Sequence, residues 1–195
     1  MMFDKPIYER EDFTDLDSLP ETIERTRFVD CRFNGLSFAD TRLRGAVFER
    51  CSFDGARISG TVETCAFLNC SFRYANLLGA EFDGCKMTGS IVGDGGYSII
   101  GGDWSYTTLT GLRMKKRKPG AVNFTGASMF DCRFESCDLA GSKFDNVIAD
   151  KLDLRNSDIS GASFAACNFA SISFKGCTAD LEFAILFTRA HGIKI

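Results

Sequence analysis

The chain has 195 residues, of which 45% are hydrophobic and 25% are charged, and it contains 19 Phe, 9 Cys and 19 Gly. So many Phe side chains exclude a disordered chain, because they cannot all remain in water, and glycine without a three-residue period excludes collagen. The formal net charge of −3 is weakly acidic and argues against a general nucleic-acid-binding protein.

Residues 1–24 are expected to form an N-terminal segment that caps the rest of the chain. The start of the chain, MMFDKPIYERED, is charged and lacks the apolar core of a secretory signal. No apolar run in the sequence approaches the ~20 residues of a membrane span. We therefore expect a cytoplasmic protein, in whose reducing surroundings disulfides are rare.

From about residue 25 to residue 178, large apolar residues recur every five positions. The register slips by one residue after Ile58, and it slips a second time across the Gly-rich stretch 93–102. Of the 29 central positions that this period predicts, 27 hold a large apolar residue, and only Pro119 and Ala149 interrupt the pattern. A small residue usually stands two positions before each centre, and Gly often stands two positions after it.

This pattern predicts a square coil of β-structure. Residues two apart in an extended segment face the same side, so the small residue and the centre both point inward. The polar residues after the centre break the alternation and require a turn, for which Gly is suited. If each corner turns by about a right angle, four pentads close one coil of twenty residues, and centres twenty apart stack. The two columns expected on this basis are Trp104, Phe124, Phe144 and Phe164, and Phe134, Leu154 and Phe174.

Two segments are predicted to break the coil as loops, near 93–103 and 115–120. The first is Gly-rich but lacks the signature of a phosphate-binding loop. In the second, an uninterrupted coil would bury Arg117 and place Pro119 in a sheet, and both are unfavourable. A flexible outward loop is therefore expected, either simply solvated or contacting a partner through its basic residues Lys115, Lys116, Arg117 and Lys118.

All nine cysteines occupy the small inward position: Cys31, Cys51, Cys65, Cys70, Cys85, Cys132, Cys137, Cys167 and Cys177. Metal binding is the alternative, but neighbouring Cys are spaced CxxxxC rather than CxxC, and no His lies near them. We therefore expect small buried core residues, with no metal and no cofactor. Because the sequence has a single histidine, His191, most His-dependent catalytic triads are excluded. The sequence also shows no convergent cluster of acid and base residues, so an enzyme is not expected.

Acidic side chains gather in the C-terminal part of the repeat. Asp138 and Asp158 are twenty residues apart and should stack on one face, and Arg133 should lie beneath Asp153. The carboxylates form either a solvated, partly paired face or a partner-binding face. Its candidate members are Asp131, Glu135, Asp138, Asp145, Asp150, Asp153 and Asp158.

The last segment, 179–195, abandons the five-residue period. Leu181, Ile185 and Leu186 recur at helical spacing, Gly192 ends the predicted helix, His191 is expected to cap it, and residues 193–195 resemble a short strand. The open end of the coil needs a cap, but this helix is apolar on more than one face. The excess predicts a homodimer interface formed by Phe183, Leu186, Phe187, Ile193 and Ile195.

The units Cys-Arg-Phe-Asn-Gly at 31–35 and Ala-Ser-Phe-Ala-Ala at 162–166 resemble those of the pentapeptide-repeat proteins. That resemblance implies an all-β fold, a right-handed quadrilateral β-helix, here with a C-terminal α-helix. The ending Ala-Ile-Leu-Phe-Thr-Arg-Ala-His-Gly-Ile at 184–193 is similar to that of the quinolone-resistance, or Qnr/MfpA-like, group. This second resemblance implies a homodimer joined at its C-termini that mimics DNA, binds DNA gyrase in its place and uses projecting loops for partner contact.

We therefore expect a non-enzymatic DNA-mimic protein that binds DNA gyrase, a type II topoisomerase, and modulates or protects it, conferring fluoroquinolone resistance. Neither a membrane nor direct binding to DNA is expected. The alternative is a pentapeptide-repeat scaffold that binds a different protein partner.

Overall fold

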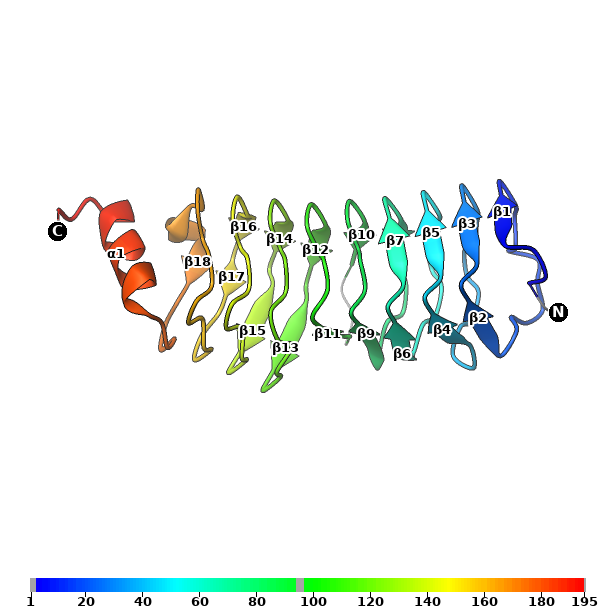
Figure 1. Ribbon diagram of the computed structural model, residues 1–195, viewed down its shortest axis with the longest axis horizontal. Helices are drawn as coiled ribbons and strands as arrows, with labels where there is room; N and C mark the ends of the chain where they lie inside the picture. The colour runs from blue at the N-terminus through cyan, green and yellow to red at the C-terminus, as the bar shows by residue number, and fades with distance from the viewer. Residues whose placement is uncertain (1–2, 94–96, 195) are drawn as a thin grey trace.

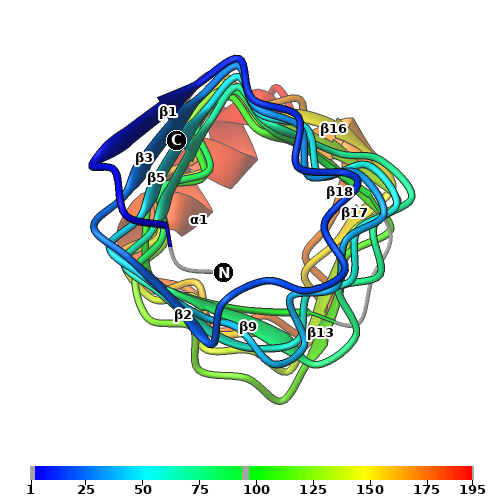
Figure 2. The same ribbon diagram turned by 90° about the vertical axis from the view of Figure 1, so that its right-hand side faces the viewer.

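The computed structural model describes residues 3–93 and 97–194, which form a rod of stacked coils closed at one end by a helix (Figure 1). Along the rod, strands of successive coils pair in parallel and build four sheets. We call them faces I to IV in the order in which the chain visits them. Figure 2 looks along the rod from its N-terminal end and shows the coils superposed as a four-sided ring. The square coil predicted from the repeat is therefore confirmed.

Each face is a ladder of short strands. Face I contains β1 (Ile7–Glu9), β3 (Arg27–Val29), β5 (Val47–Glu49) and β7 (Ala66–Leu68). Face II contains β8 (Ser71–Phe72), β10 (Ile91–Val92), β12 (Thr108–Thr110), β14 (Ser128–Phe130) and β16 (Ile148–Asp150). Face III contains β13 (Arg113–Lys115), β15 (Arg133–Glu135), β17 (Leu152–Asp153) and β18 (Ile172–Ser173). Face IV contains β2 (Thr22–Glu24), β4 (Arg42–Arg44), β6 (Gly60–Glu63), β9 (Ala80–Asp83) and β11 (Ser98–Ile100).

Coil length explains both slips in the sequence register. Phe28 pairs with Phe48, twenty residues on, whereas Phe48 pairs with Phe67 after only nineteen. The second slip is a coil of seventeen residues, in which Phe82 pairs with Ile99. Residues 97–103 thus continue the coil through β11 instead of projecting as the predicted loop, because the coil is shortened there and not extended. Residues 94–96 of the expected loop lie outside the described part of the chain.

The interior is filled by the predicted central residues. Phe144 is completely buried, and its ring stacks on those of Phe124 and Phe164, with ring centroids 5.2 and 4.9 Å apart. Every cysteine is a free thiol; seven are buried, and Cys167 and Cys177 are half-buried. The small inward position predicted for cysteine is therefore confirmed by its burial.

The coil begins earlier than the sequence analysis placed it. Residues 7–24, expected to be part of a separate cap, form the first coil, since Ile7 pairs with Arg27 and Thr22 pairs with Arg42. The signal was present, because Tyr8, Phe13 and Ile23 lie on the same five-residue period and are buried. Counting from Tyr8 to Phe164 gives eight steps along face I, or roughly 40 Å of rod at ~4.8 Å per coil.

The C-terminal segment is a helix followed by an irregular end. After the short 3-10 helix η1 (Phe169–Ser171), the helix α1 (Leu181–Ala190) begins at Asp180, whose carboxylate accepts a hydrogen bond from the Phe183 backbone N–H at 2.8 Å. His191 caps its C-terminal end, as predicted. Ile193 and Lys194 are not in a strand, which corrects the strand expected over 193–195, and Ile195 lies outside the described residues. Over the described residues, α1 included, no helix has the length and apolar character needed to cross a membrane.

Candidate partner-binding surfaces

The basic run lies in a corner of the coil between faces III and IV. Arg113 pairs with Arg133, twenty residues on, so no residues are inserted between them to make a loop. Pro119 is buried at its central position, and its carbonyl accepts a hydrogen bond from the Gly101 N–H at 2.6 Å. The 115–120 segment is therefore a corner of the coil with no inserted residues, and not an added loop.

The corner nevertheless turns outward, and Pro119 explains why. In the next coil, the Leu139 N–H donates a hydrogen bond to the carbonyl of Asp158, a bond that Pro119 cannot make. Arg117 occupies an inward position of the repeat but is exposed. Figures 1 and 2 show the corner after β13 reaching further from the rod axis than its neighbours. Outward displacement thus removes the burial cost that the sequence analysis foresaw for Arg117.

Face III and its two corners carry an excess of positive charge. Eight cationic side chains, which we call the basic strip, lie there: Arg113, Lys115, Lys116, Arg117, Arg133, Lys151, Arg155 and Lys175. The same positions of these coils hold three carboxylates, Asp131, Glu135 and Asp153. The strip therefore has a formal charge of 8 − 3 = +5. The rest of the sequence has 15 basic and 23 acidic residues, a charge of −8. Lys118 continues the basic run onto face IV, in the row that Asp138 and Asp158 occupy in the next two coils.

The three carboxylates of the strip all form ion pairs with cations of the strip. Lys115 Nζ lies 2.8 Å from Glu135 Oε1, and an Arg113 nitrogen lies 2.5 Å from Asp131 Oδ2. Asp153 lies between Arg133 and Arg155, and the Arg155 Nε donates to it at 2.7 Å. Arg133 and Asp153 occupy paired positions in adjacent coils, as predicted.

Asp153 is the buried member of this network, with 8% of its surface exposed. Burial by itself raises the pKa of the Asp153 carboxyl, but hydrogen bonds from Arg155 and the charges of Arg155 and Arg133 outweigh it and hold the pKa below its ordinary value. The hydrogen bond from Lys115 similarly lowers the pKa of Glu135. Both carboxylates are therefore charged at neutral pH and already committed to partners within the chain.

The seven candidate acidic residues do not share one surface. Asp138 and Asp158 stack on face IV, as predicted, and are joined by a parallel β-bridge. Asp145 follows a central residue of face I, and Asp150 ends strand β16 of face II. The remaining three belong to the basic strip. A single acidic face is thus corrected to carboxylates distributed around the rod, because successive pentads turn through successive corners.

Four of these carboxylates form no ion pair within the described part of the chain: Asp138, Asp145, Asp150 and Asp158. Asp138 and Asp158 accept hydrogen bonds from backbone N–H groups two residues ahead, those of Ala140 and Ser160. The side-chain and backbone hydrogen bonds of Ser160 lower the pKa of Asp158. The charges of these four groups remain available to a cationic surface.

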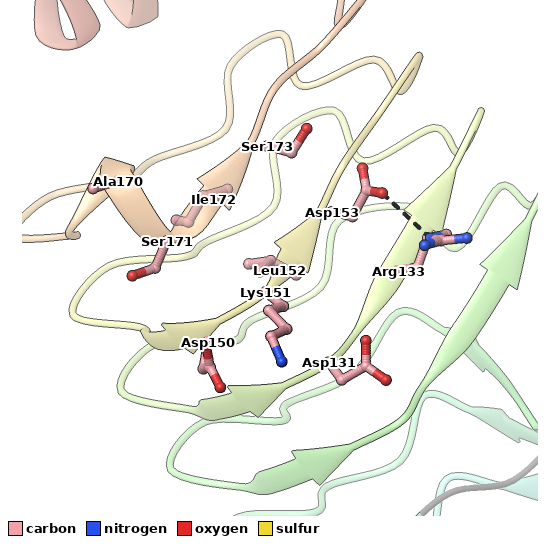
Figure 3. A pocket seen from close by; sticks show the side chains of 10 residues that line it. All are labelled: Asp131, Arg133, Asp150, Lys151, Leu152, Asp153, Ala170, Ser171, Ile172 and Ser173. Atoms are coloured by element: carbon pink, nitrogen blue, oxygen red, sulfur yellow. Dashed lines mark ion pairs between the residues drawn. The ribbon is translucent and has the colours of Figure 1, made fainter.

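A hollow of about 510 Å³ lies at the corner between faces II and III (Figure 3). Its charged rim includes Asp131, Arg133, Asp150, Lys151 and Asp153, and Figure 3 shows the ion pair between Arg133 and Asp153 along one side. Carboxylates and cations alternate around it, so it offers no field of one sign. Across residues 3–93 and 97–194, no three His, Cys, Asp or Glu side chains are placed together to hold a metal ion.

The C-terminal helix covers the end of the coil with two of its aromatic residues. Phe183 lies 5.0 Å from Phe174 and 5.3 Å from Phe164, measured between ring centroids. Phe187 similarly packs on Phe169, at 5.7 Å. These two predicted interface residues therefore serve as the cap, since the open coil end presents Phe rings that must be buried.

Other apolar residues of this end remain outside. Leu186 is 36% exposed and Ile193 is 57% exposed. Leu181, which is not among the interface residues predicted from the sequence, is 75% exposed. A hollow of about 530 Å³ lies between α1 and the last coil and is lined partly by Ile185 and Leu186. Ile195 lies outside the described residues.

The comparisons with known proteins agree with this architecture. Residues 43–91 match the family described as pentapeptide repeats (9 copies). The full-length structure of QnrB1, a plasmid-mediated fluoroquinolone resistance protein, is similar with a TM-score of 0.79 and 20% sequence identity, covering 96% of this chain and 97% of that one. A trypsin-treated variant of QnrB1 gives the same score and identity over 97% and 96% of the two chains. No curated protein matches this chain by sequence.

Proposed function

We propose that this chain, a pentapeptide-repeat protein with the fold of QnrB1, is a non-enzymatic protein that binds DNA gyrase or a related type II topoisomerase and protects it from fluoroquinolones. One observation carries the proposal. The fold matches that of a fluoroquinolone resistance protein with a TM-score of 0.79 over 97% of this chain and 96% of that one.

The charge distribution supports a mechanism of DNA mimicry. Outside the basic strip the sequence has a charge of −8, and Asp138 and Asp158 present carboxylates in register along face IV. A rod with acidic faces offers a basic DNA-binding groove the charge and the elongated shape of a duplex. The parallel ladder holds these carboxylates in place, so little side-chain order is lost on binding.

The exposed apolar residues support a homodimer formed through the C-terminal helix. Leu181, Leu186 and Ile193 are exposed at this end of the chain, and Leu186 also lines the hollow beside α1. A two-fold contact would cover them and place two rods end to end. This arrangement would double the length of the acidic track that faces the topoisomerase.

The test is a gyrase supercoiling assay with and without a fluoroquinolone. Wild type should alter supercoiling or restore it in the presence of the drug. The double variant Asp138→Lys with Asp158→Lys should lose most of this effect, because it reverses charge on face IV. Its matched control, Asp17→Lys with Asp40→Lys, makes the same change at two exposed sites near the N-terminal end. Equal activity of both variants would exclude face IV as the contact surface.

Dimerisation is tested separately with Leu186→Asp, since Leu186 is exposed and lies outside the cap formed by Phe183 and Phe187. The variant should sediment as a folded monomer and protect gyrase less than wild type, because a buried unpaired carboxylate is costly at an interface. If wild type itself sediments as a monomer, the dimer is wrong. If no variant and no wild type affects gyrase, a scaffold for another partner replaces the proposal.

A further inference from the structure

We propose that the basic strip is a second docking surface, separate from the acidic faces, and that it binds a short acidic segment of a partner protein. This proposal does not rest on the identity of the topoisomerase target. It begins from an imbalance on face III, where eight cations accompany three carboxylates that are already paired.

The unpaired cations are concentrated at one corner. Lys116, Arg117 and Lys118 are consecutive and exposed, and none forms an ion pair with a carboxylate of the described chain. Lys175 is likewise exposed and without an ion pair to a described residue on the same edge of face III, and Lys151 is so at the opposite corner of that face. A group of cations without ion pairs is the electrostatic footprint of an anion-binding surface.

The sequence of this corner departs from the repeat in a way that favours an exposed cationic surface. A regular pentad would place a small residue at 117 and a large apolar residue at 119, as Cys137 and Leu139 do one coil later. Instead, Arg117 and Pro119 give up one ladder hydrogen bond and one buried side chain. Neither change improves the core, but together they move three adjacent cations outward.

The rows of the strip run along the rod. Lys115, Glu135, Arg155 and Lys175 occupy equivalent positions in successive coils, about 4.8 Å apart. An extended polypeptide with acidic side chains can follow such a row, meeting Arg155 and Lys175 and turning at the Lys116–Lys118 corner. Glu135 interrupts the positive row but is neutralised by Lys115.

The surroundings favour a short acidic peptide over a nucleic acid. The rest of the sequence has a charge of −8, so a duplex that extended beyond the strip would meet repulsion. The strip is also a mosaic, in which Glu135 and Asp131 would lie against phosphates. An acidic segment can end where the strip ends and place neutral residues opposite these carboxylates.

The experiment measures fluorescence anisotropy of a labelled oligoglutamate peptide, with a labelled DNA duplex of equal charge as the second probe. Wild type should bind the peptide more tightly than the duplex, and binding should weaken as salt rises. The triple variant Lys116→Glu, Arg117→Glu, Lys118→Glu should bind the peptide at least about tenfold more weakly. The milder Lys116→Ala with Lys118→Ala should give an intermediate loss and guards against misfolding of the triple variant.

The matched control reverses three other exposed cations that form no ion pair with a described residue: Arg57→Glu, Arg73→Glu, Lys143→Glu. It has the same net charge as the triple variant and should retain peptide binding within about twofold. An equal loss in the control would show that only net charge matters and would overturn the proposal. Tighter binding of the duplex would make the strip a nucleic-acid site, and absence of peptide binding by wild type would exclude the docking surface. None of these outcomes depends on whether gyrase is the target.

Discussion

The N-terminal half of the rod, up to Val92, is more regular inside than the half that begins at Ser98, and its net charge has the opposite sign. In the N-terminal half, Phe28, Phe48 and Phe67 stack with ring centroids 5.0 Å apart and interplanar angles of 5 to 6°. A second stack on the adjacent face joins Phe33 to Phe53 at 5.1 Å. In the C-terminal half the equivalent positions of face II are Leu109 and Met129, which form no such stack.

The surfaces differ in charge. Residues 1–92 have 11 basic and 15 acidic side chains, a charge of −4, and residues 98–195 have 12 and 10, a charge of +2. Cross-coil ion pairs occupy cations of the N-terminal half, as between Arg27 and Glu49 at 2.6 Å and between Arg50 and Asp30 at 2.8 Å. In the C-terminal half, cations gather on face III, while Asp138 and Asp158 stack on face IV without an ion pair to any described residue. The N-terminal half therefore combines a regular core with an acidic surface, whereas the C-terminal half separates its charges between two faces.

Truncation of a stacked ring tests the interior side of this contrast and has the largest expected effect. Phe48→Ala and Phe144→Ala should each lower the free energy of unfolding by about 3–5 kcal/mol, because both rings are fully buried. Phe48 should be the costlier loss, since its ring is nearly parallel to both stacking neighbours, whereas Phe144 is tilted by 29° from Phe124. Urea unfolding measures both free energies, and Tyr74→Ala is the control because the Tyr74 side chain is 93% exposed. A loss below about 1 kcal/mol for either Phe would contradict the packing described.

A substitution of Asp153 tests an ion pair of the C-terminal half whose carboxylate is buried. Asp153→Asn should lower the free energy of unfolding by about 1–3 kcal/mol, because Arg133 and Arg155 lose their shared counter-charge. The folded pKa of Asp153 is depressed, so its contribution is present above the unfolded pKa of about 3.9 and is lost as pH falls through the lower folded value.

The measurement is stability against pH for wild type and variant. The two curves should be separated at neutral pH and converge on the acid side. Asp138→Asn, which removes an unpaired carboxylate of face IV, provides the control and should change stability little. Parallel curves down to strongly acid pH would show that Asp153 has no depressed pKa.

The sequence predicted the interior far better than the surface, for physical reasons. The column through Phe124, Phe144 and Phe164 results from period five and a square cross-section, which together fix every inward position. Which face an outward residue occupies depends on counting corners across shortened coils, so sequence spacing alone does not show that a corner separates Asp138 from Asp145. The first coil is hard to recognise from the sequence because Ser18 interrupts the period that Tyr8 and Phe13 continue.

The C-terminal helix α1 shows a second limit of prediction from the sequence. Helical spacing indicates that Phe183 and Phe187 share a side, but not which surface covers that side. The three-dimensional answer is the chain's own coil end, whose Phe174 ring lies 5.0 Å from Phe183. The outward turn at Arg117 was similarly hidden, because it depends on which ladder hydrogen bond Pro119 fails to make.

A cysteine substitution tests the smallest difference between the halves. Along face II the small inward position holds Cys31, Cys51 and Cys70 in the N-terminal half, and then Ser90 and Thr107. The Cys51 thiol donates to the Phe28 carbonyl at 3.4 Å, and the Ser90 hydroxyl donates to the equivalent Phe67 carbonyl at 2.8 Å. The two residue types therefore perform the same role in the same column.

Cys51→Ser should consequently cost no more than about 1 kcal/mol, because the hydroxyl keeps the hydrogen bond and fits a site that the column already fills with Ser. Burial raises the pKa of the thiols at equivalent positions, to about 11 for Cys65 and about 12 for Cys85, so they should react slowly with thiol reagents while the chain is folded. Urea unfolding of Cys51→Ser and labelling of the native protein check the two statements. Half-buried Cys167 and Cys177 should be labelled first. A loss approaching that of Phe144→Ala, or stoichiometric zinc that disappears with Cys51, would show that the sulfur has a role that a hydroxyl cannot fill.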